Sequence, residues 1–382
     1  MPDGRPGEAP ARKMDTFAAR CLQSVREKDL FEPGERLLVG FSGGPDSVAL
    51  SLALLEISEE GQFPFDIHLA HLNHCLRGEE ARSDVQFCRR FAEKHGLPLE
   101  IGRTDVPAAR RPEESIEEAA RRARYDFLAE SARRLGCRVV AIGHHADDVA
   151  ETVLMRLLRG CGLNGLGAMP WGRSLKSGTN IRLVRPLLEE PKRELAAFLD
   201  RRNQGFCTDS SNRDVRYRRN RIRHLLLPLL ESRCEVVTDR LVRINELAVK
   251  AGRELDAFTK SLAASMVVEK RRGELALDAG AYRHLSTAMR KWTARHALRD
   301  LDGNPGEPPG LRREHYDALA ALVGRPVGTE LTLPGGRLAR REHGLMYFRT
   351  SSVPPVRWDC SLEVPGCAVT NHKRFTFRAR LV

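Results

Sequence analysis

The 382-residue chain lacks several features that assign a protein to a class directly. No apolar run approaches the ~20 residues needed to span a bilayer, and the Pro/Gly-rich start has no apolar core of a secretory signal. None of the nine cysteines forms a CxxC pair, which disfavours a zinc or iron–sulfur site and suggests reduced thiols. We therefore expect a cytoplasmic protein with no membrane span and a disordered tail at residues 1–13.

The commonest nucleotide-binding signatures are also missing. The sequence contains no GxxxxGK and no Gly-Lys pair, which excludes a kinase-type P-loop. No GxGxxG follows the first predicted strand, which argues against a dinucleotide site.

Positive charge is abundant. Lys and Arg number 63 against 51 Asp and Glu, a formal net charge of +12. Such a balance favours an acidic partner, nucleic acid above all.

Short apolar runs alternate with amphipathic helical segments over roughly residues 14 to 215. This alternation predicts βαβ units and a parallel sheet covered on both faces. Ser115 and Glu118 have capping-box spacing at the start of the longest helix, and Gly136 is placed to end it. The expected strands lie within 36–42, 65–74, 98–106, 138–145 and 181–188, and the expected helices within 46–58, 79–96, 115–136, 147–160 and 192–202.

The pattern changes in the second half of the chain. We expect a second domain at 216–350, mostly helical from Arg219 to about Val323 and ending in a β-hairpin around a Pro-Gly-Gly turn. Residues 351–382 have no clear period and are expected to form a C-terminal stub.

The segment "SGGPDS", residues 42–47, sits between a predicted strand and a predicted helix. Ligands of open parallel sheets bind beyond the carboxyl ends of the strands, and a Gly-rich turn at a helix N-terminus can bind phosphate through backbone N–H groups. The negative charge of Asp46 would repel a phosphate unless a divalent cation lies between them, which suggests a magnesium–nucleotide complex. A simple tight turn is the alternative.

A second polar set, "GHHADDVAET", follows the fourth predicted strand. Asp147 and Glu151, or Asp148 and Glu151, share one helix face. Favourable placement of acids at a helix N-terminus is the alternative explanation. A third set begins at His71, at the end of the second strand, and would be uninformative alone.

A dense basic run surrounds Tyr217 and Asn220. Its arginines are too close in sequence to share one helix face, so some must have different partners. Phosphate or RNA-backbone contact is the favoured interpretation, with a solvated basic helix as the alternative. The run comprises Arg216, Arg218, Arg219, Arg221 and Arg223.

Together these motifs resemble those of the tRNA(Ile)-lysidine synthases, in the PP-loop ATP pyrophosphatase superfamily. "SGGPDS" matches the superfamily loop SGGxDS, and four other segments look like the family's own motifs: "AHLNHCLRGEEARSD", "SIEEAARRARYDFL", "GHHADDVAETVLMRLLRGCGLNGLGAM" and "DSSNRDVRYRRNRIRHLLLPLL". The resemblance is close over roughly 36–230 and fainter to about 350. Longer family members carry a further C-terminal domain, which is expected to be absent or reduced here.

The resemblance implies a fold like that of the adenine nucleotide alpha hydrolases and a two-step reaction. ATP would activate the C2 oxygen of the wobble cytidine in a tRNA(Ile) with a CAU anticodon, releasing pyrophosphate. Free lysine would then attack C2 through its side-chain amine and displace AMP, which changes decoding from AUG to AUA. ATP and Mg²⁺ are the implied cofactors.

The resemblance also implies roles for residues. Asp147 and Glu151 would bind lysine and accept its proton, with Asp148 an alternative to either, and Arg121 or Arg124 would neutralise the α-phosphate. Asp46 and Asp147 are candidate Mg²⁺ ligands. ATP contacts are expected from Ser42, Gly43, Gly44, Pro45, Asp46, Ser47, His71, Asn73 and His144. Contacts with tRNA are expected from Arg216, Arg218, Arg219, Asn220, Arg221 and Arg223.

Three rival functions remain open from sequence. A tRNA thiolase would also adenylate cytidine, but usually needs paired cysteines or a cluster. A small-molecule amidotransferase or synthetase would not need the arginine run, and a non-catalytic RNA-binding protein would not need "SGGPDS". The sequence leaves monomer and homodimer both open.

Overall fold

The computed structural model describes residues 14–76, 78–176, 178–208, 218–303, 308–350, 364, 366–369 and 376–379. The chain divides into two units, one ending at Leu255 and the other beginning at Asp256. The division falls inside helix α11 (Val237–Ser265), later than the expected boundary at residue 216, which lies outside the described residues.

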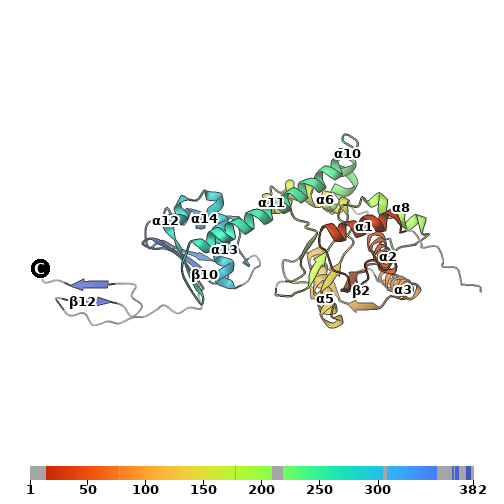
Figure 1. The fold of residues 1–382 in the computed structure, drawn as a ribbon, viewed down its shortest axis with the longest axis horizontal. Coiled ribbons are helices and arrows are strands. Elements are labelled where there is room, and N and C mark those ends of the chain that lie inside the picture. The colour runs from red at the N-terminus through yellow and green to blue at the C-terminus, as the bar shows by residue number, and fades with distance from the viewer. Residues whose placement is uncertain are drawn as a thin grey trace, which may run out of the picture. The chain divides into compact units, whose positions relative to one another are not determined.

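Unit 1 is built on a six-stranded sheet in the order β3-β2-β1-β4-β6-β5 (Figure 1). All neighbouring pairs are parallel except β5 with β6. The predicted α/β class is confirmed, while the short antiparallel edge strand β5 was not predicted. The strands are β1 (Arg36–Gly40), β2 (Asp66–Asn73), β3 (Leu99–Arg103), β4 (Val139–Ala141), β5 (Gly172–Ser174) and β6 (Arg182–Val184).

Helices cover both faces of this sheet (Figure 1). The described helical segments of unit 1 that precede α11 are α1 (Thr16–Glu27), α2 (Pro45–Glu59), α3 (Glu79–Lys94), α4 (Val106–Ala109), α5 (Ile116–Leu135), α6 (Ala146–Leu157), α7 (Leu163–Leu166), α8 (Lys192–Arg201), α9 (Arg218–Arg221), the π-helical turn η2 (Ile222–Leu226) and α10 (Leu227–Glu231). The last three, α9, η2 and α10, pack with α6 and not on the sheet.

Strand β1 shows why the sheet is buried on both sides. Leu37 and Val39 pack into one apolar core with α1, α2, α3 and α8, whereas Leu38 packs into another with α5. Successive strand residues point to opposite faces, so a continuous apolar run is what a doubly covered strand requires. The carboxyl end of β1 is thereby fixed between two layers of helices.

Helix α5 begins and ends as the sequence predicts. The Ser115 hydroxyl accepts from the Glu118 N–H (3.2 Å), and the Glu118 carboxylate accepts from the Ser115 N–H (2.9 Å). Gly136 ends the helix at φ +68°, a left-handed conformation that glycine adopts without strain.

Unit 2 contains a five-stranded antiparallel sheet in the order β7-β8-β11-β10-β9, packed against its helices. The hairpin predicted around Pro-Gly-Gly is confirmed by pairing of β9 with β10. The strands are β7 (Val267–Arg271), β8 (Glu274–Asp278), β9 (Glu330–Leu333), β10 (Arg337–Arg341) and β11 (Leu345–Thr350), and the helices are α12 (Ala279–His284), α13 (Thr287–Asp302) and α14 (Arg313–Leu322).

The expectation of mostly helix through Val323 is wrong at β7 and β8. Glu, Lys, Arg, Leu and Ala dominate this stretch and favour helix locally. Gly273 turns the chain at φ +74°, and Leu275 and Leu277 pack into the core of unit 2, so tertiary packing overrides propensity. A separate pair, β12 (Gly366–Val369) and β13 (Thr376–Ala379), lies within the expected C-terminal stub.

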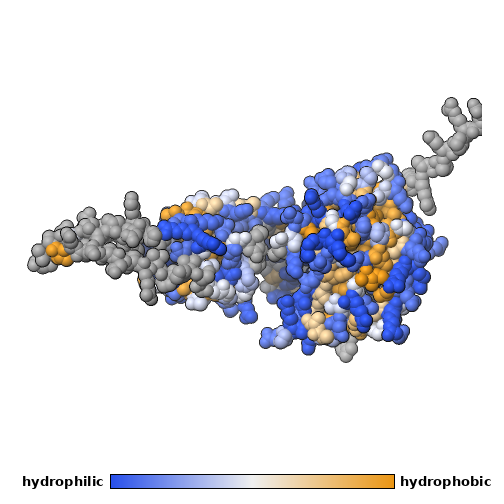
Figure 2. Space-filling model, turned by 90° about the horizontal axis from the view of Figure 1, so that it is seen from below, coloured by the Kyte–Doolittle hydropathy of each residue, from blue (hydrophilic) through white to orange (hydrophobic). Residues whose placement is uncertain are grey.

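The surface view in Figure 2 mixes hydrophilic and apolar residues over both units. Among the helices that the structure describes, none is both long and apolar enough to cross a membrane.

Candidate active site

The loop Ser42–Ser47 joins β1 to α2, and its own hydroxyls hold it in shape. The Ser42 N–H donates to Ser47 Oγ (3.2 Å), the Gly44 N–H to Ser42 Oγ (3.3 Å), and Ser47 Oγ to the Gly44 carbonyl (3.0 Å). Gly44 is the N-cap of α2 and has no side chain to bond the first-turn N–H groups. Uncapped N–H groups at a helix start favour an anion.

Two glycines allow close packing around this loop, Gly43 within it and Gly143 opposite it. Gly43 has φ +81°, and a Cβ there would lie 3.2 Å from Cys207 Sγ. Gly143, just after β4, is tighter: a Cβ would lie 2.6 Å from the carbonyl oxygen of Asp46. Gly143 was not singled out from the sequence, although its position directly after a buried strand was the available signal.

His71 and Asn73, expected to bind ATP, both contact nearby backbone. Nδ1 of the buried His71 lies 3.0 Å from the carbonyl oxygen of Phe41, directly before the loop. The Asn73 Oδ1 accepts from the Cys75 N–H at 2.8 Å. These contacts hold His71 against the residue that precedes the loop, and Asn73 lies at the end of β2, the strand next to β1. ATP binding by either residue stays a prediction.

His145 connects the loop to α6, and sequence reasoning missed it. Its Nε2 is 3.7 Å from Asp46 Oδ1 and 3.6 Å from Asp148 Oδ2, and its Nδ1 is 3.5 Å from Asp147 Oδ2. Burial alone would lower the pKa of His145, but the surrounding carboxylates, that of Asp148 first, raise it to about 9. The ring is therefore a buried cation at neutral pH.

Asp148 and Glu151 bind two arginines from the basic run. Arg219 donates to Glu151 Oε2 (2.6 Å) and Asp148 Oδ1 (2.7 Å), and Arg223 donates through Nε to Glu151 Oε1 and through Nη2 to Oε2 (3.0 Å). The carboxylate side chains are 9% and 1% exposed. Burial would raise the pKa of Asp148, but His145 and Arg219 hold it well below its usual value. Asp148 and Glu151 are thus both engaged by the two arginines.

Asp147 has different surroundings. Its Oδ2 accepts from the Lys192 N–H at 2.9 Å, at the start of α8, and its side chain is 33% exposed. Burial opposes its ionisation, but His145 and the Lys192 N–H hold its pKa below the ordinary value. Of the three acids grouped from sequence, Asp147 is the most accessible.

Asp46 is the carboxylate whose environment fits a cation. Its Oδ1 is shielded from solvent and has no hydrogen-bond partner. Burial raises its pKa and Asp148 acts in the same direction, against the lowering effect of the His145 ring 3.7 Å away. In the described parts of the chain, no cluster of three or more His, Cys, Asp or Glu side chains is arranged to hold a metal. Mg²⁺ usually takes one or two carboxylates plus substrate phosphates, and Asp46 fits that mode.

Arg121 and Arg124 lie on α5, both against the ring of Tyr125. The guanidinium carbons are 5.0 Å and 5.8 Å from its centroid, and Arg173 of β5 lies at 5.1 Å. Burial would raise the pKa of Tyr125, but these cations lower it overall. The geometry does not choose between Arg121 and Arg124.

The arginines of the basic run point in different directions, as their spacing predicts. Arg219 and Arg223 point to the carboxylates, whereas Arg218 and Arg221 are exposed and Asn220 is buried. Arg216 lies outside the described residues. The π-helical turn η2 carries Arg223, and such turns occur often at functional sites.

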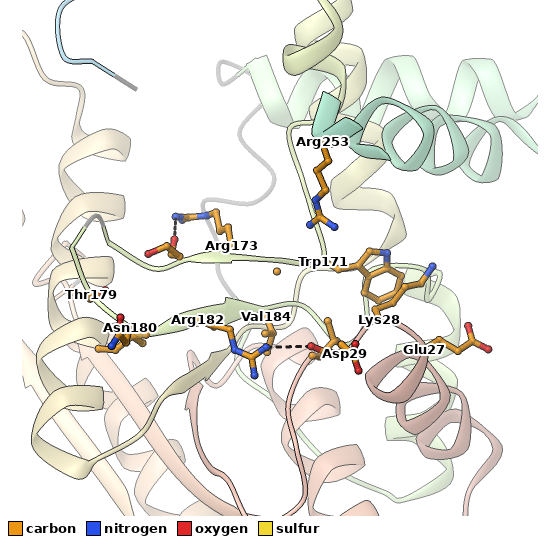
Figure 3. Close-up of a pocket in the computed structure, with 14 residues that line it drawn as sticks. Glu27, Lys28, Asp29, Trp171, Arg173, Thr179, Asn180, Arg182, Val184 and Arg253 are labelled. Atoms are coloured by element: carbon orange, nitrogen blue, oxygen red, sulfur yellow. Dashed lines mark hydrogen bonds between the residues drawn. The ribbon is translucent and has the colours of Figure 1, made fainter. Parts of the chain in front are cut away.

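A cleft of about 750 Å³ opens elsewhere in unit 1, between α1, the β5–β6 hairpin and α11. Figure 3 shows Arg253 reaching toward it above β5, with Trp171 and Lys28 at one end. None of the described residues that line this cleft was expected to bind ATP, lysine or tRNA.

Comparisons with known proteins define the class. A family model described as the PP-loop domain matches residues 14–230, so unit 1 carries the ATP-binding domain of that class. The tRNA(Ile)-lysidine synthase of Geobacter sulfurreducens is 35% identical over 95% of this chain and 74% of that protein. That of Geobacillus kaustophilus is 32% identical over 85% and 68%, and that of Porphyromonas gingivalis 40% identical over 59% and 48%. The chain belongs to the tRNA(Ile)-lysidine synthase family.

A solved structure of a tRNA thiolase is also similar. The U34-tRNA thiolase NcsA from Methanococcus maripaludis, at 22% identity, covers 61% of this chain and 79% of its own with a TM-score of 0.48. Likeness at this level assigns no chemistry.

Proposed function

We propose that this chain ligates free lysine to C2 of the wobble cytidine in a tRNA(Ile) with a CAU anticodon, converting ATP to AMP and pyrophosphate. The supporting observation is that the glycine–serine loop and the acid–arginine cluster meet at His145. Its Nε2 lies within 3.7 Å of both Asp46 and Asp148. The groups proposed for ATP activation and those proposed for lysine transfer would therefore lie at the same edge of the sheet.

In the first step, the cytidine C2 oxygen bonds to the α-phosphorus of ATP, and the bond to the pyrophosphate oxygen breaks. Loop N–H groups, the Ser42 and Ser47 hydroxyls and the α2 N-terminus would stabilise the departing pyrophosphate. Mg²⁺, held by Asp46 and the phosphates with Asp147 as a further candidate ligand, would supply additional positive charge. Arg121 or Arg124 would neutralise the α-phosphate.

In the second step, the lysine side-chain nitrogen bonds to C2, and the bond from C2 to the AMP oxygen breaks. The amine has an ordinary pKa of ~10.4 and must lose a proton before it attacks. Asp147 is the accessible acid and would take the ammonium and that proton. Glu151 could join it only after Arg219 or Arg223 releases a carboxylate oxygen, and Asp148 has the same constraint.

The exposed arginines would bind the tRNA. Arg218 and Arg221 face solvent beside the ion-paired Arg219 and Arg223. Phosphate contacts of this kind make affinity fall with salt concentration. Arg216, Arg219, Asn220 and Arg223 stay candidate tRNA contacts from the sequence, although Asn220 is buried and Arg219 and Arg223 are ion-paired. The proposed reaction would take place in the cytoplasm.

A thiolase is the rival that uses the same first step. Cys88 and Cys207 both lie close to Gly43, since a Cβ there would be 3.3 Å and 3.2 Å from their sulfurs. Cys88 is fully buried, and burial raises the pKa of its thiol well above the ordinary value. A nucleophilic sulfur needs the thiolate, so these surroundings disfavour Cys88 as the sulfur carrier of a thiolase.

The deciding experiment incubates the protein with ATP, radiolabelled lysine and total tRNA. We expect ATP-dependent label in RNA, with AMP and pyrophosphate released. Consumption of ATP to AMP with no labelled RNA would indicate a thiolase or a small-molecule synthetase, and no ATP consumption would indicate a binding protein.

The variant Asp147→Asn tests the second step alone. Asparagine keeps an oxygen for the Lys192 N–H but removes the negative charge. ATP binding should persist while lysine transfer falls at least ~100-fold, the range of general acid–base effects. Asp126→Asn, at a surface pair with Lys176, is the control. Undiminished transfer by Asp147→Asn would remove Asp147 from the lysine site.

A further inference from the structure

His144 and Arg185 follow neighbouring parallel strands and meet at the same sheet edge. His144 lies between β4 and α6, and Arg185 directly follows β6. The Arg185 Nε is 3.0 Å from the His144 Nδ1. Arg185 was not singled out from the sequence.

This contact fixes which ring nitrogen of His144 carries the proton. An arginine has only donors, so Nδ1 must offer its lone pair. The proton of the neutral ring then sits on Nε2, the other edge of the imidazole. His144 as a whole is partly exposed, and Nε2 is the ring nitrogen that the Arg185 contact leaves for a ligand.

Arg185 is itself held rigidly. Its side chain is 2% exposed, its Nη1 donates to the Pro170 carbonyl, and its backbone N–H donates to the Trp171 carbonyl at 2.9 Å. A buried guanidinium with fixed partners can orient a neighbouring ring at little cost in entropy.

The charges around His144 keep it neutral. Burial lowers its pKa to about 3, and Arg185, Arg219 and Arg124 act in the same direction, against Asp148. His145, one residue later, is surrounded by carboxylates and is cationic. Adjacent histidines are thus held in opposite protonation states.

We propose that Arg185 is a positioning residue that holds His144 as a neutral Nε2–H donor to a phosphate oxygen of bound ATP. This inference rests on the proposed function for the identity of the ligand, but the tautomer itself does not depend on it. A neutral donor stabilises developing negative charge on phosphate without competing as an acid.

The direct test is ¹⁵N NMR of histidine-labelled full-length protein, with His144→Gln identifying the resonances. Wild type should show an unprotonated Nδ1 and a protonated Nε2 for His144, unchanged between pH 5 and 8. Titration of this ring near pH 6.5, or a proton on Nδ1, would overturn the proposal. This readout stands even if lysine is never transferred.

Variants of Arg185 test whether the tautomer of His144 matters for ATP binding. Arg185→Met should release the tautomer, so that the proton of the neutral His144 ring is shared between Nδ1 and Nε2, and should raise the KM for ATP about tenfold, the loss of one good hydrogen bond. The KM for lysine should stay within twofold of the wild-type value. Arg185→Lys, which keeps a donor, should restore most of the affinity for ATP.

Arg182→Met, at the start of the strand that Arg185 follows, is the control. An unchanged KM for ATP in Arg185→Met, or an equal rise for lysine, would contradict the assigned role. If that variant fails to fold, the wild-type spectrum and Arg185→Lys still decide.

Discussion

The two halves of the site are built in different ways. The loop Ser42–Ser47 is mostly a local structure: its hydroxyl hydrogen bonds join residues at most five positions apart, and one distant bond runs from the Cys207 N–H to the Gly43 carbonyl at 2.8 Å. The acid–arginine cluster joins α6 to a segment 68 to 75 positions away in sequence. Backbone geometry determines the shape of the loop, and the balance of charges determines the arrangement of the acid–arginine cluster. His145 couples them, so a change in either half should reach the other.

The largest effect is expected from Glu151→Gln, which would break the long-range half. Arg219 and Arg223 would share only Asp148, and breaking a buried ion pair costs about 3–5 kcal/mol. Thermal unfolding should show a Tm lowered by about 10 °C.

Glu130→Gln is the matched control for that change. Glu130 pairs with Arg133 on the surface of α5, where both side chains are 65% exposed. Such a pair is worth about 0.2–1 kcal/mol. Equal destabilisation by Glu130→Gln and Glu151→Gln would mean that the cluster has no special energetic role.

The pH dependence of stability tests the coupling through His145. Its pKa is about 9 in the folded protein and ~6.5 when unfolded, so its stabilising contribution is complete below pH 6.5 and is lost as pH rises through 9. The shift corresponds to about 3 kcal/mol.

Urea unfolding of wild type and His145→Gln at pH 6 and pH 10 measures this contribution. The stability difference between the two proteins should shrink by about 3 kcal/mol at the higher pH. A difference independent of pH would show that the ring is not a cation in the folded protein.

Gly143→Ala tests the local half. The added Cβ would press on the Asp46 carbonyl and shift the first turn of α2. Displacement of about 1 Å in an active site can cost ~100-fold, and we expect kcat/KM for ATP to fall by that factor. Gly162→Ala, where a Cβ meets nothing within 4 Å, should keep normal kinetics. Normal ATP kinetics in Gly143→Ala would contradict the close packing of β4 on the loop.

The smallest effect is expected at a purely local feature away from both halves. Ser115→Ala removes the N-cap of α5 and should cost about 1 kcal/mol of unfolding free energy. Lysine transfer should not change. A larger loss of activity than of stability would implicate the start of α5 in substrate binding.

This contrast also explains what the sequence could predict. The five predicted strands and five predicted helices of unit 1 appear in the expected order, and the α5 caps and the Pro-Gly-Gly hairpin are confirmed, whereas α1, α4, α7 and β5 were not predicted. The strands β7 and β8 were missed because their composition favours helix and only packing of Leu275 and Leu277 reveals them.

Within the site, residue types were easier to predict than partners. The carboxylates and arginines were recognised separately, but no spacing rule pairs Glu151 with Arg219 or Arg223. His145 and Arg185 were missed for the same reason: a histidine's role depends on the charges around it, which only the fold brings together.

A crystal structure with a non-hydrolysable ATP analogue and Mg²⁺ tests the central claim most directly. The triphosphate should lie on backbone N–H groups of the loop Ser42–Ser47, in which Pro45 has none to donate, with the metal at Asp46. A triphosphate bound in the cleft near Trp171 and Arg253, with the loop empty, would contradict it.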